Sequence, residues 1–304
     1  MALQLFKYPF TAMGSPCEIQ LYAASVSDAA AVAQSIIHDI ERLESKYSRY
    51  RPDSFLAEIN RAAAKARKIA IDDETASLLH YAQTCYEQSD GLFDISSGVL
   101  RKLWDFKQSD AMRIPNPEHI QRVLQYVGWD KVRWTSSSLA FSAKNMELDF
   151  GGIVKEYAAD RAASIAYAMK LKYGIVNLGG DIRVIGPHPD GSPWRIGVQD
   201  PRHKNAVLKV VALEHGAMAS SGDYERCIQI NGQRYSHILN PQTGFPVNYL
   251  AAVTVTSDLC VLAGSASTIA MLKADQGMAW LSDLGLPHLW VTVDGKMGGD
   301  LVDI

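Results

Sequence analysis

Cysteine, blocks of like charge and long apolar runs are all scarce in this chain of 304 residues. Its four cysteines lie far apart and in no metal-ligand spacing, which predicts free, mostly buried thiols instead of a disulfide framework. No apolar stretch is long enough for a membrane span. The net charge of -3 comes without any block of lysine and arginine, so binding to nucleic acid is not expected.

Several common catalytic motifs are also missing. The chain has no metal-binding histidine pair, no nucleophile elbow and no phosphate loop ending in Gly-Lys-Ser/Thr. A glycine turn at 177–181 lacks the third glycine of a dinucleotide fingerprint, which disfavours hydride transfer of that type. The N-terminus shows no charged segment followed by an apolar core, so we expect a cytoplasmic protein, or a periplasmic one if a leader was removed.

The most informative segment is the run Leu148-Asp149-Phe150-Gly151-Gly152-Ile153-Val154-Lys155. An acid closing an extended segment, two glycines and a helical pattern predict a strand, a tight turn and the start of a helix. The free N–H groups of a first helical turn favour an anion such as phosphate, and Lys155 adds positive charge. A structural turn with a solvated lysine fits this segment equally well.

The rest of the pattern predicts one continuous α+β domain over 1–304 with a surface insertion near 107–118. Helices are expected over 28–47, 54–60, 72–88, 100–106, 117–128 and 264–284. Strands are expected over 11–22, with a bend at 13–16 within or before it, and over 173–178, 181–186, 194–199, 207–213, 251–256 and 289–293. Asn231-Gly232 predicts a hairpin turn between two further strands.

Loops rich in glycine, hydroxyl and carboxylate groups recur along the chain, and a phosphate-bearing ligand would explain many of them at once. Asp94 lies in such a loop, where a ligand contact and a simple helix cap are equally compatible with the pattern. His237 precedes Asn-Pro-Gln-Thr-Gly, which suits either a catalytic histidine or a structural one.

Taken together, these loops resemble those of the flavin transferase family known as ApbE, from about residue 10 to residue 296. The motifs that carry the resemblance are Ala12-Met13-Gly14-Ser15, Tyr50-Arg51-Pro52-Asp53-Ser54, Asp90-Gly91-Leu92-Phe93-Asp94, Leu148 to Lys155, Val176-Asn177-Leu178-Gly179-Gly180-Asp181, Ser221-Gly222-Asp223-Tyr224 and His237-Ile238-Leu239-Asn240-Pro241-Gln242-Thr243-Gly244. The resemblance implies a T-fold-like α+β domain with mixed or antiparallel sheets packed by helices.

The resemblance also implies the positions of the functional residues. Residues expected around FAD are Met13, Tyr50, Leu92, Phe93, Asp94, Asp149, Lys155, His237 and Ile238. Those expected to act in catalysis are Asp149, Lys155 and His237. Those expected to bind magnesium are Gly152, through its main-chain oxygen, Ser267 and Thr268.

Two positions depart from the family pattern. An aspartate that binds the metal in relatives is replaced by Gly264, and because hard cations prefer carboxylate ligands we expect weaker magnesium binding. The nearest acid along the chain is Asp258. Glu156 stands where many relatives have glycine.

The implied activity is FAD:protein FMN transfer, in which FMN moves from FAD to a threonine or serine of a target flavoprotein and AMP leaves. Two alternatives remain open. Loss of the aspartate at 264 would suit an FAD-binding carrier or sensor without a catalytic metal, and water as acceptor would give an FAD pyrophosphatase.

Overall fold

The computed structural model describes residues 2–104, 106, 113–224 and 226–302. Among them, eight strands form the main sheet, in which every neighbouring pair is antiparallel. In spatial order the strands are β1 (Gln4–Ala12), β2 (Ser15–Ala23), β6 (Gly174–Leu178), β7 (Asp181–Gly186), β10 (Ala217–Gly222), β13 (Leu250–Ser257), β14 (His288–Thr292) and β15 (Met297–Gly298).

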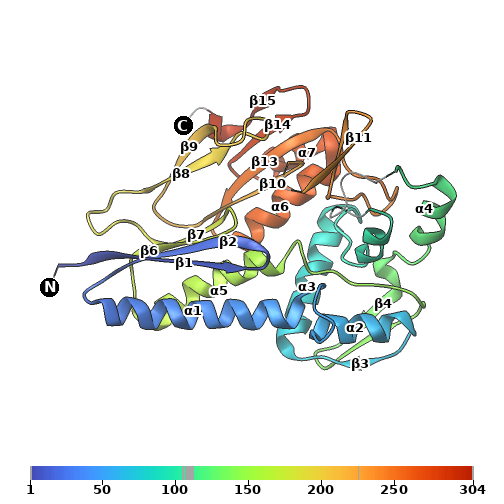
Figure 1. The fold of residues 1–304 in the computed structure, drawn as a ribbon, viewed down its shortest axis with the longest axis horizontal. Helices are drawn as coiled ribbons and strands as arrows, with labels where there is room; N and C mark the ends of the chain where they lie inside the picture. Colours follow the sequence, from blue (N-terminus) through green and yellow to red (C-terminus); the bar gives the residue numbers. More distant parts are fainter. Residues whose placement is uncertain (1, 105, 107–112, 225, 303–304) are drawn as a thin grey trace.

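Helices cover one face of this sheet and a hairpin covers the other (Figure 1). The helical layer contains α1 (Val26–Tyr47), α5 (Val154–Ala168) and α6 (Cys260–Lys273), and α7 (Gly277–Asp283) packs beside α6. The hairpin consists of β8 (Trp194–Gln199) and β9 (Val207–Leu213). Alternate residues of the strands therefore face two separate apolar cores, with Val176 in the helical one and Ile175 in the other.

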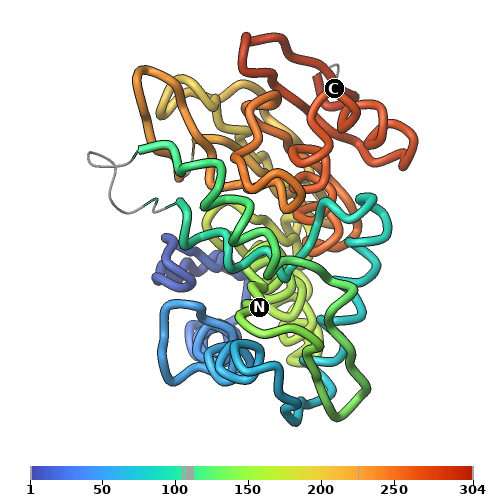
Figure 2. The backbone as a smooth tube through the Cα atoms, turned by 90° about the vertical axis from the view of Figure 1, so that its right-hand side faces the viewer, coloured from blue at the N-terminus to red at the C-terminus, as the bar shows by residue number. Residues whose placement is uncertain are grey.

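A second region of the chain packs against one end of this layer. It contains α2 (Phe55–Ala64), α3 (Asp73–Gln88) and a small sheet of β3 (Ile69–Ala70), β5 (Ser138–Phe141) and β4 (Val132–Trp134). Close to it lie α4 (Pro117–Leu124) and the hairpin of β11 (Cys227–Ile230) and β12 (Gln233–Ser236) (Figure 2). Side chains of α4 and of this hairpin share one apolar cluster. Short 3-10 turns lie at η1 (Gly98–Lys102), η2 (Trp129–Lys131), η3 (Ala274–Gln276) and η4 (Asp300–Val302).

Three helices, α1, α2 and α3, begin after a residue whose side chain accepts a hydrogen bond from an N–H of the first turn. Ser25 caps α1 by accepting from Asp28 N, Ser54 caps α2, and Asp72 caps α3 by accepting from Thr75 N. The predicted helices over 28–47, 54–60 and 72–88 and the expected α+β fold are thus confirmed. The four cysteines are free, and Cys227 alone among them is partly exposed.

Other expectations were wrong in detail. The bend expected within or before the strand over 11–22 is a two-residue hairpin turn at Met13 and Gly14, so that strand starts only at Ser15, as β2, and residues 4–12 form the separate strand β1. The helix expected over 264–284 breaks after Lys273, where Ala274 has a φ of 54°. The helix expected over 100–106 is the short turn η1, and α4 ends at Leu124.

The expected insertion near 107–118 falls partly outside the described residues, since the structure describes 113–118 but not 107–112. Its extent, and the domain limits at 1 and 304, stay predictions. None of the described helices combines the length and the apolarity needed to cross a bilayer.

Candidate active site

The turn between β1 and β2 consists of Met13 and Gly14, since Ala12 pairs with Ser15. Both turn residues have positive φ, 52° and 72°, as a two-residue hairpin of the I′ type requires. Gly14 suits this backbone, whereas a left-handed methionine is uncommon and is seen mostly where the surroundings enforce it. A Cβ on Gly14 would lie 3.5 Å from a guanidinium nitrogen of Arg226, which places the turn beside the loop after β10.

Two arginines hold Tyr50 and Asp149 next to this turn. Arg49 pairs with the Asp149 carboxylate and donates from Nη2 to Tyr50 Oη at 2.8 Å. Arg226 donates to the same Tyr50 oxygen at 3.3 Å. Partial burial raises the pKa of Tyr50, but the Arg49 hydrogen bond and both guanidinium charges outweigh it, so the net shift of the pKa is downward. Tyr50 remains 53% exposed, and it therefore offers an aromatic face to a ligand on a positively charged rim.

The Asp149 to Gly152 segment forms the tight turn expected before α5. Asp149 Oδ1 accepts from Gly151 N at 2.9 Å, and its own N–H donates to Ile95 O at 2.8 Å. A Cβ on Gly152 would lie 3.2 Å from Phe93 Cζ, so glycine lets the backbone approach that ring. Phe93 is only 6% exposed, and it supports the turn from the core side.

Asp94 is buried behind the same turn. Its carboxylate accepts from Ser96 N at 2.7 Å and from Trp129 N at 3.2 Å. Burial raises its pKa, and these hydrogen bonds oppose the rise only in part. These contacts tie two loops together, but they do not cap η1, whose N-cap residue is Ser97 without a side-chain cap hydrogen bond. The neighbouring Leu92 is half-buried.

Lys155, in the first turn of α5, reaches across to the turn between β6 and β7. Its Nζ lies 2.9 Å from Asp181 Oδ2, and a Cβ on Gly179 would lie 4.0 Å from the same nitrogen. Asp181 is 2% exposed, and burial raises its pKa against the opposing charge of Lys155. The pair fixes a lysine beside a glycine backbone, an arrangement suited to an anionic ligand.

His237 lies between β12 and the Asn-Pro-Gln-Thr-Gly loop. Its Nδ1 is 3.1 Å from Arg226 O, and because a carbonyl only accepts, Nδ1 carries the proton and Nε2 keeps a lone pair. Desolvation, followed by the charges of Arg226, Arg49 and Lys155, lowers the pKa of His237 to about 4. The imidazole is therefore neutral at physiological pH, and Ile238 is half-buried next to it.

Three hydroxyl groups meet where α6 packs on β10. Ser267 Oγ donates to Gly264 O at 2.9 Å, and Ser221 Oγ lies 2.8 Å from Ser267 Oγ and 2.9 Å from Thr268 Oγ1. Each hydroxyl has a single proton, so Ser221 donates to Ser267 and Thr268 donates to Ser221. With the hydroxyl protons placed in this way, both lone pairs of the Thr268 oxygen are available to a cation.

The donor set near these hydroxyls fits a hard divalent cation that takes oxygen ligands from main chain, hydroxyl and carboxylate groups. Within the described ranges, no group of three or more His, Cys, Asp or Glu side chains could hold a metal. A metal here would thus rely on oxygens such as Gly152 O and Thr268 Oγ1. Asp258 is exposed and precedes α6.

The sequence expectations named many of these positions, whose roles stay predictions, but did not single out the two arginines that hold Tyr50. Arg49 and Arg226 were not among the expected site residues, although Arg49 directly precedes the Tyr50 motif. Asp181 was expected in a ligand loop, but its pairing with Lys155 depends on the β6–β7 turn facing α5. Phe93 and Asp94 were expected to contact ligand, and both are buried beneath the loops.

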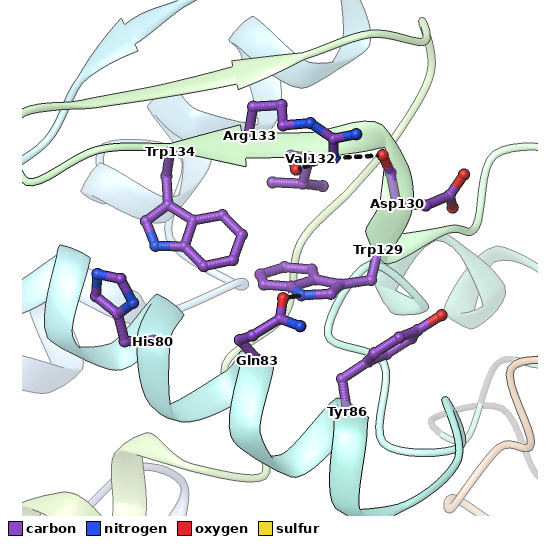
Figure 3. A pocket seen from close by; sticks show the side chains of 8 residues that line it. All are labelled: His80, Gln83, Tyr86, Trp129, Asp130, Val132, Arg133 and Trp134. Atoms are coloured by element: carbon purple, nitrogen blue, oxygen red, sulfur yellow. Dashed lines mark hydrogen bonds between the residues drawn. The ribbon is translucent and has the colours of Figure 1, made fainter.

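A separate surface hollow of about 500 Å³ lies between α3 and the segment 129–134 (Figure 3). Its lining includes two tryptophans, Trp129 and Trp134, whose ring centroids are 5.0 Å apart. None of the expected site residues lines it. This hollow is thus distinct from the loop cluster described above.

Comparison with known proteins links the loop cluster to one family. The model of the ApbE family matches residues 13–290. An FAD:protein FMN transferase of Vibrio cholerae is 27% identical over 290 residues, covering 93% of this chain and 86% of its own. The enzyme of that name from Haemophilus influenzae is 29% identical, covering 77% of this chain and 69% of its own.

Solved structures agree with this match. The ApbE protein of Thermotoga maritima superposes with a TM-score of 0.90 and 32% identity, covering 97% of each chain. The flavinyl transferase ApbE of Pseudomonas stutzeri superposes with a TM-score of 0.86 and 28% identity, covering 98% of this chain and 94% of that one. Since the family model spans the segments that carry every loop of the site, the chain belongs to the ApbE family.

Proposed function

We propose that this protein is an FAD:protein FMN transferase, which moves FMN from FAD to a threonine or serine hydroxyl of an acceptor flavoprotein and releases AMP. The observation that carries the proposal is the match to relatives of that name over 93% of the chain, with all the loops of the site inside the matched region. The cationic rim of Arg49, Arg226 and Lys155 suits a substrate with a pyrophosphate.

In the proposed reaction the acceptor oxygen forms a bond to the FMN phosphorus while the bond from that phosphorus to the AMP oxygen breaks. His237 Nε2 takes the proton of the attacking hydroxyl, because its lone pair is free while Nδ1 donates to Arg226 O. Lys155 and the N–H groups at the start of α5 stabilise charge on the phosphate oxygens. Asp149 fixes Arg49, and through it Tyr50, in the substrate-binding position.

Magnesium is part of this proposal. Gly152 O and Thr268 Oγ1, with Ser267 behind them, would hold the ion, which when bound would act as a Lewis acid toward the phosphate oxygens. We propose preferential binding of FAD over FMN or riboflavin, because loops from both halves of the chain are available to hold the adenylate as well as the flavin.

The test is incubation of the protein with FAD, magnesium and an acceptor peptide carrying a threonine, followed by mass spectrometry. A mass increase of one FMN on the peptide, with one AMP released, supports transfer. AMP and FMN released without peptide modification would instead identify a pyrophosphatase. FAD retained intact under all conditions would identify a carrier or sensor.

A further inference from the structure

The side chain of Glu156 fills the space beside Gly264. An ideal Cβ built on Gly264 would lie 2.5 Å from Glu156 Cγ and 3.0 Å from Glu156 Oε1. Glu156 is 7% exposed, so its carboxylate is held inside the protein, against the face of α6. The two departures from the family pattern, which are 108 positions apart in the sequence, are therefore in direct contact.

The register between α5 and α6 relates this contact to the proposed metal site. Asp160 on α5 accepts from Cys260 N at 2.8 Å and Val261 N at 2.9 Å, at the start of α6. One turn earlier on α5, Glu156 faces Gly264, one turn further along α6. The helices thus run in opposite directions, so continuing past the Glu156–Gly264 contact leads back along α5 to its start beside Gly152 and onward along α6 to Thr268.

Helix geometry directs both side chains toward the same region. Side chains tilt toward the N-terminus of their own helix, so Glu156 leans toward Gly152 and Thr268 leans toward the level of Gly264. The Glu156 carboxylate and the Thr268 hydroxyl therefore converge from two antiparallel helices. Burying an ionised carboxylate is costly, and a bound cation would offset that cost.

We infer that Glu156 supplies the carboxylate ligand for the divalent cation, in place of the aspartate that relatives carry at position 264. The inference rests on the proposed transferase function, because that function supplies the metal. If Glu156 is the ligand, Gly264 makes room for the Glu156 carboxylate, and the glycine does not weaken metal binding.

Asp258 is the competing acid, and its place in the fold argues against it. It precedes the first residue of α6 and is exposed. Thr268 lies ten residues further along, roughly 15 Å away at the rise of an α-helix. One ion could not be bound by both.

The experiment measures manganese binding directly, by the electron paramagnetic resonance signal of free Mn²⁺ in the presence of saturating FAD and without acceptor. Glu156→Gln is expected to weaken Mn²⁺ binding by about tenfold or more, because the site loses its negative charge. Asp258→Asn, the matched control, is expected to bind like the unchanged protein. The double variant Glu156→Gly with Gly264→Asp is expected to recover the binding lost in Glu156→Gln.

The inference is overturned if Glu156→Gln binds Mn²⁺ as tightly as the unchanged protein, if Asp258→Asn is the variant that loses binding, or if the unchanged protein binds no Mn²⁺. Circular dichroism checks that each variant folds. If Glu156→Gln does not fold, Glu156→Asp provides the test, and a fold-intact protein with unchanged affinity would again overturn the inference. Failure of the transferase proposal shows separately, as absence of transfer by the unchanged protein with Mn²⁺ bound through Glu156.

Discussion

Two clusters of ion pairs in this protein use the same chemical groups in different surroundings. The first, which we term the helix cluster, joins α1, α3 and α5 through Asp39, Arg42, Lys46, Glu74 and Arg161. The second belongs to the candidate site and contains the pairs Arg49–Asp149 and Lys155–Asp181.

The pKa of Glu74 in the helix cluster and the pKa of Asp181 in the site shift in opposite directions. In the helix cluster the hydrogen bond from Arg42 lowers the pKa of Glu74 to about 2, with a second contribution from Lys46. In the site, burial raises the pKa of Asp181 despite its lysine partner. The comparison teaches that pairing alone does not define the role of a carboxylate: the partly solvated cluster favours the charged acid, whereas the site holds a buried acid at a cost.

The sharpest test of this contrast removes one lysine from each cluster. Lys155→Met should lower the rate of FMN transfer about 10²- to 10³-fold, the usual effect of losing one group that stabilises transition-state charge. Lys46→Met, its matched control in the helix cluster, should transfer at close to the original rate. Single-turnover assays read by mass measure both, and equal rates for the two variants would break the comparison.

Because Lys155 also faces buried Asp181, a loss of fold could imitate a loss of catalysis. The double variant Lys155→Met with Asp181→Asn removes the unpaired acid and should regain stability without regaining activity. Recovery of transfer in this double variant would show that Lys155 serves the fold only.

The next largest effect concerns crowding between α5 and α6. Gly264→Asp alone should lower the free energy of unfolding by about 1–3 kcal/mol, since the new Cβ meets Glu156 at 2.5 Å. Adding Glu156→Gly to this variant should restore most of the lost free energy of unfolding. Denaturant unfolding of the three proteins measures the effect, and a Gly264→Asp protein as stable as the original would mean that Glu156 moves aside freely.

A smaller effect is expected in the helix cluster. Glu74→Gln should lower the free energy of unfolding by about 1 kcal/mol, as expected for a partly exposed ion-pair network, and leave transfer unchanged. The folded pKa of Glu74 lies below its ordinary value of 4.5, so this stabilisation is present above about pH 4.5 and lost as the pH falls toward 2. Thermal unfolding at several pH values should show the two proteins converging in acid, and a constant difference would contradict the assignment.

The smallest effect concerns the exposed aromatic of the site. Tyr50→Ala should weaken FAD binding by about 1 kcal/mol, or roughly fivefold, through loss of one aromatic contact. Phe93→Leu, at a buried position, should change stability more than FAD affinity. Calorimetric titration with FAD distinguishes them, and unchanged affinity in Tyr50→Ala would remove Tyr50 from the binding site.

Local signals in the sequence were sufficient for part of this structure. The caps Ser25, Ser54 and Asp72 and the apolar spacing of α1 and α3 depend on neighbouring residues, and these helices begin within two residues of the expected positions. The turn at Asp149 to Gly152 is likewise local. The family resemblance then assigned expected roles to the residues on these loops.

What the sequence did not reveal depends on contacts between distant segments. Glu156 and Gly264 each looked like an isolated departure, and their contact is visible only once α5 and α6 pack in antiparallel register. The break after Lys273 was missed, although the polar run Asp275-Gln276-Gly277 follows it before the apolar pattern resumes in α7. Arg226 contacts Tyr50 across 176 positions of sequence, which no local pattern could indicate.

The most direct test of the whole account is a crystal structure of the protein with FAD and manganese, with the metal located by its anomalous scattering. The account predicts one metal peak bound by Gly152 O, Thr268 Oγ1 and the Glu156 carboxylate, with the FAD pyrophosphate beside Lys155. A metal peak on Asp258, or FAD bound in the hollow between Trp129 and Trp134, would contradict it.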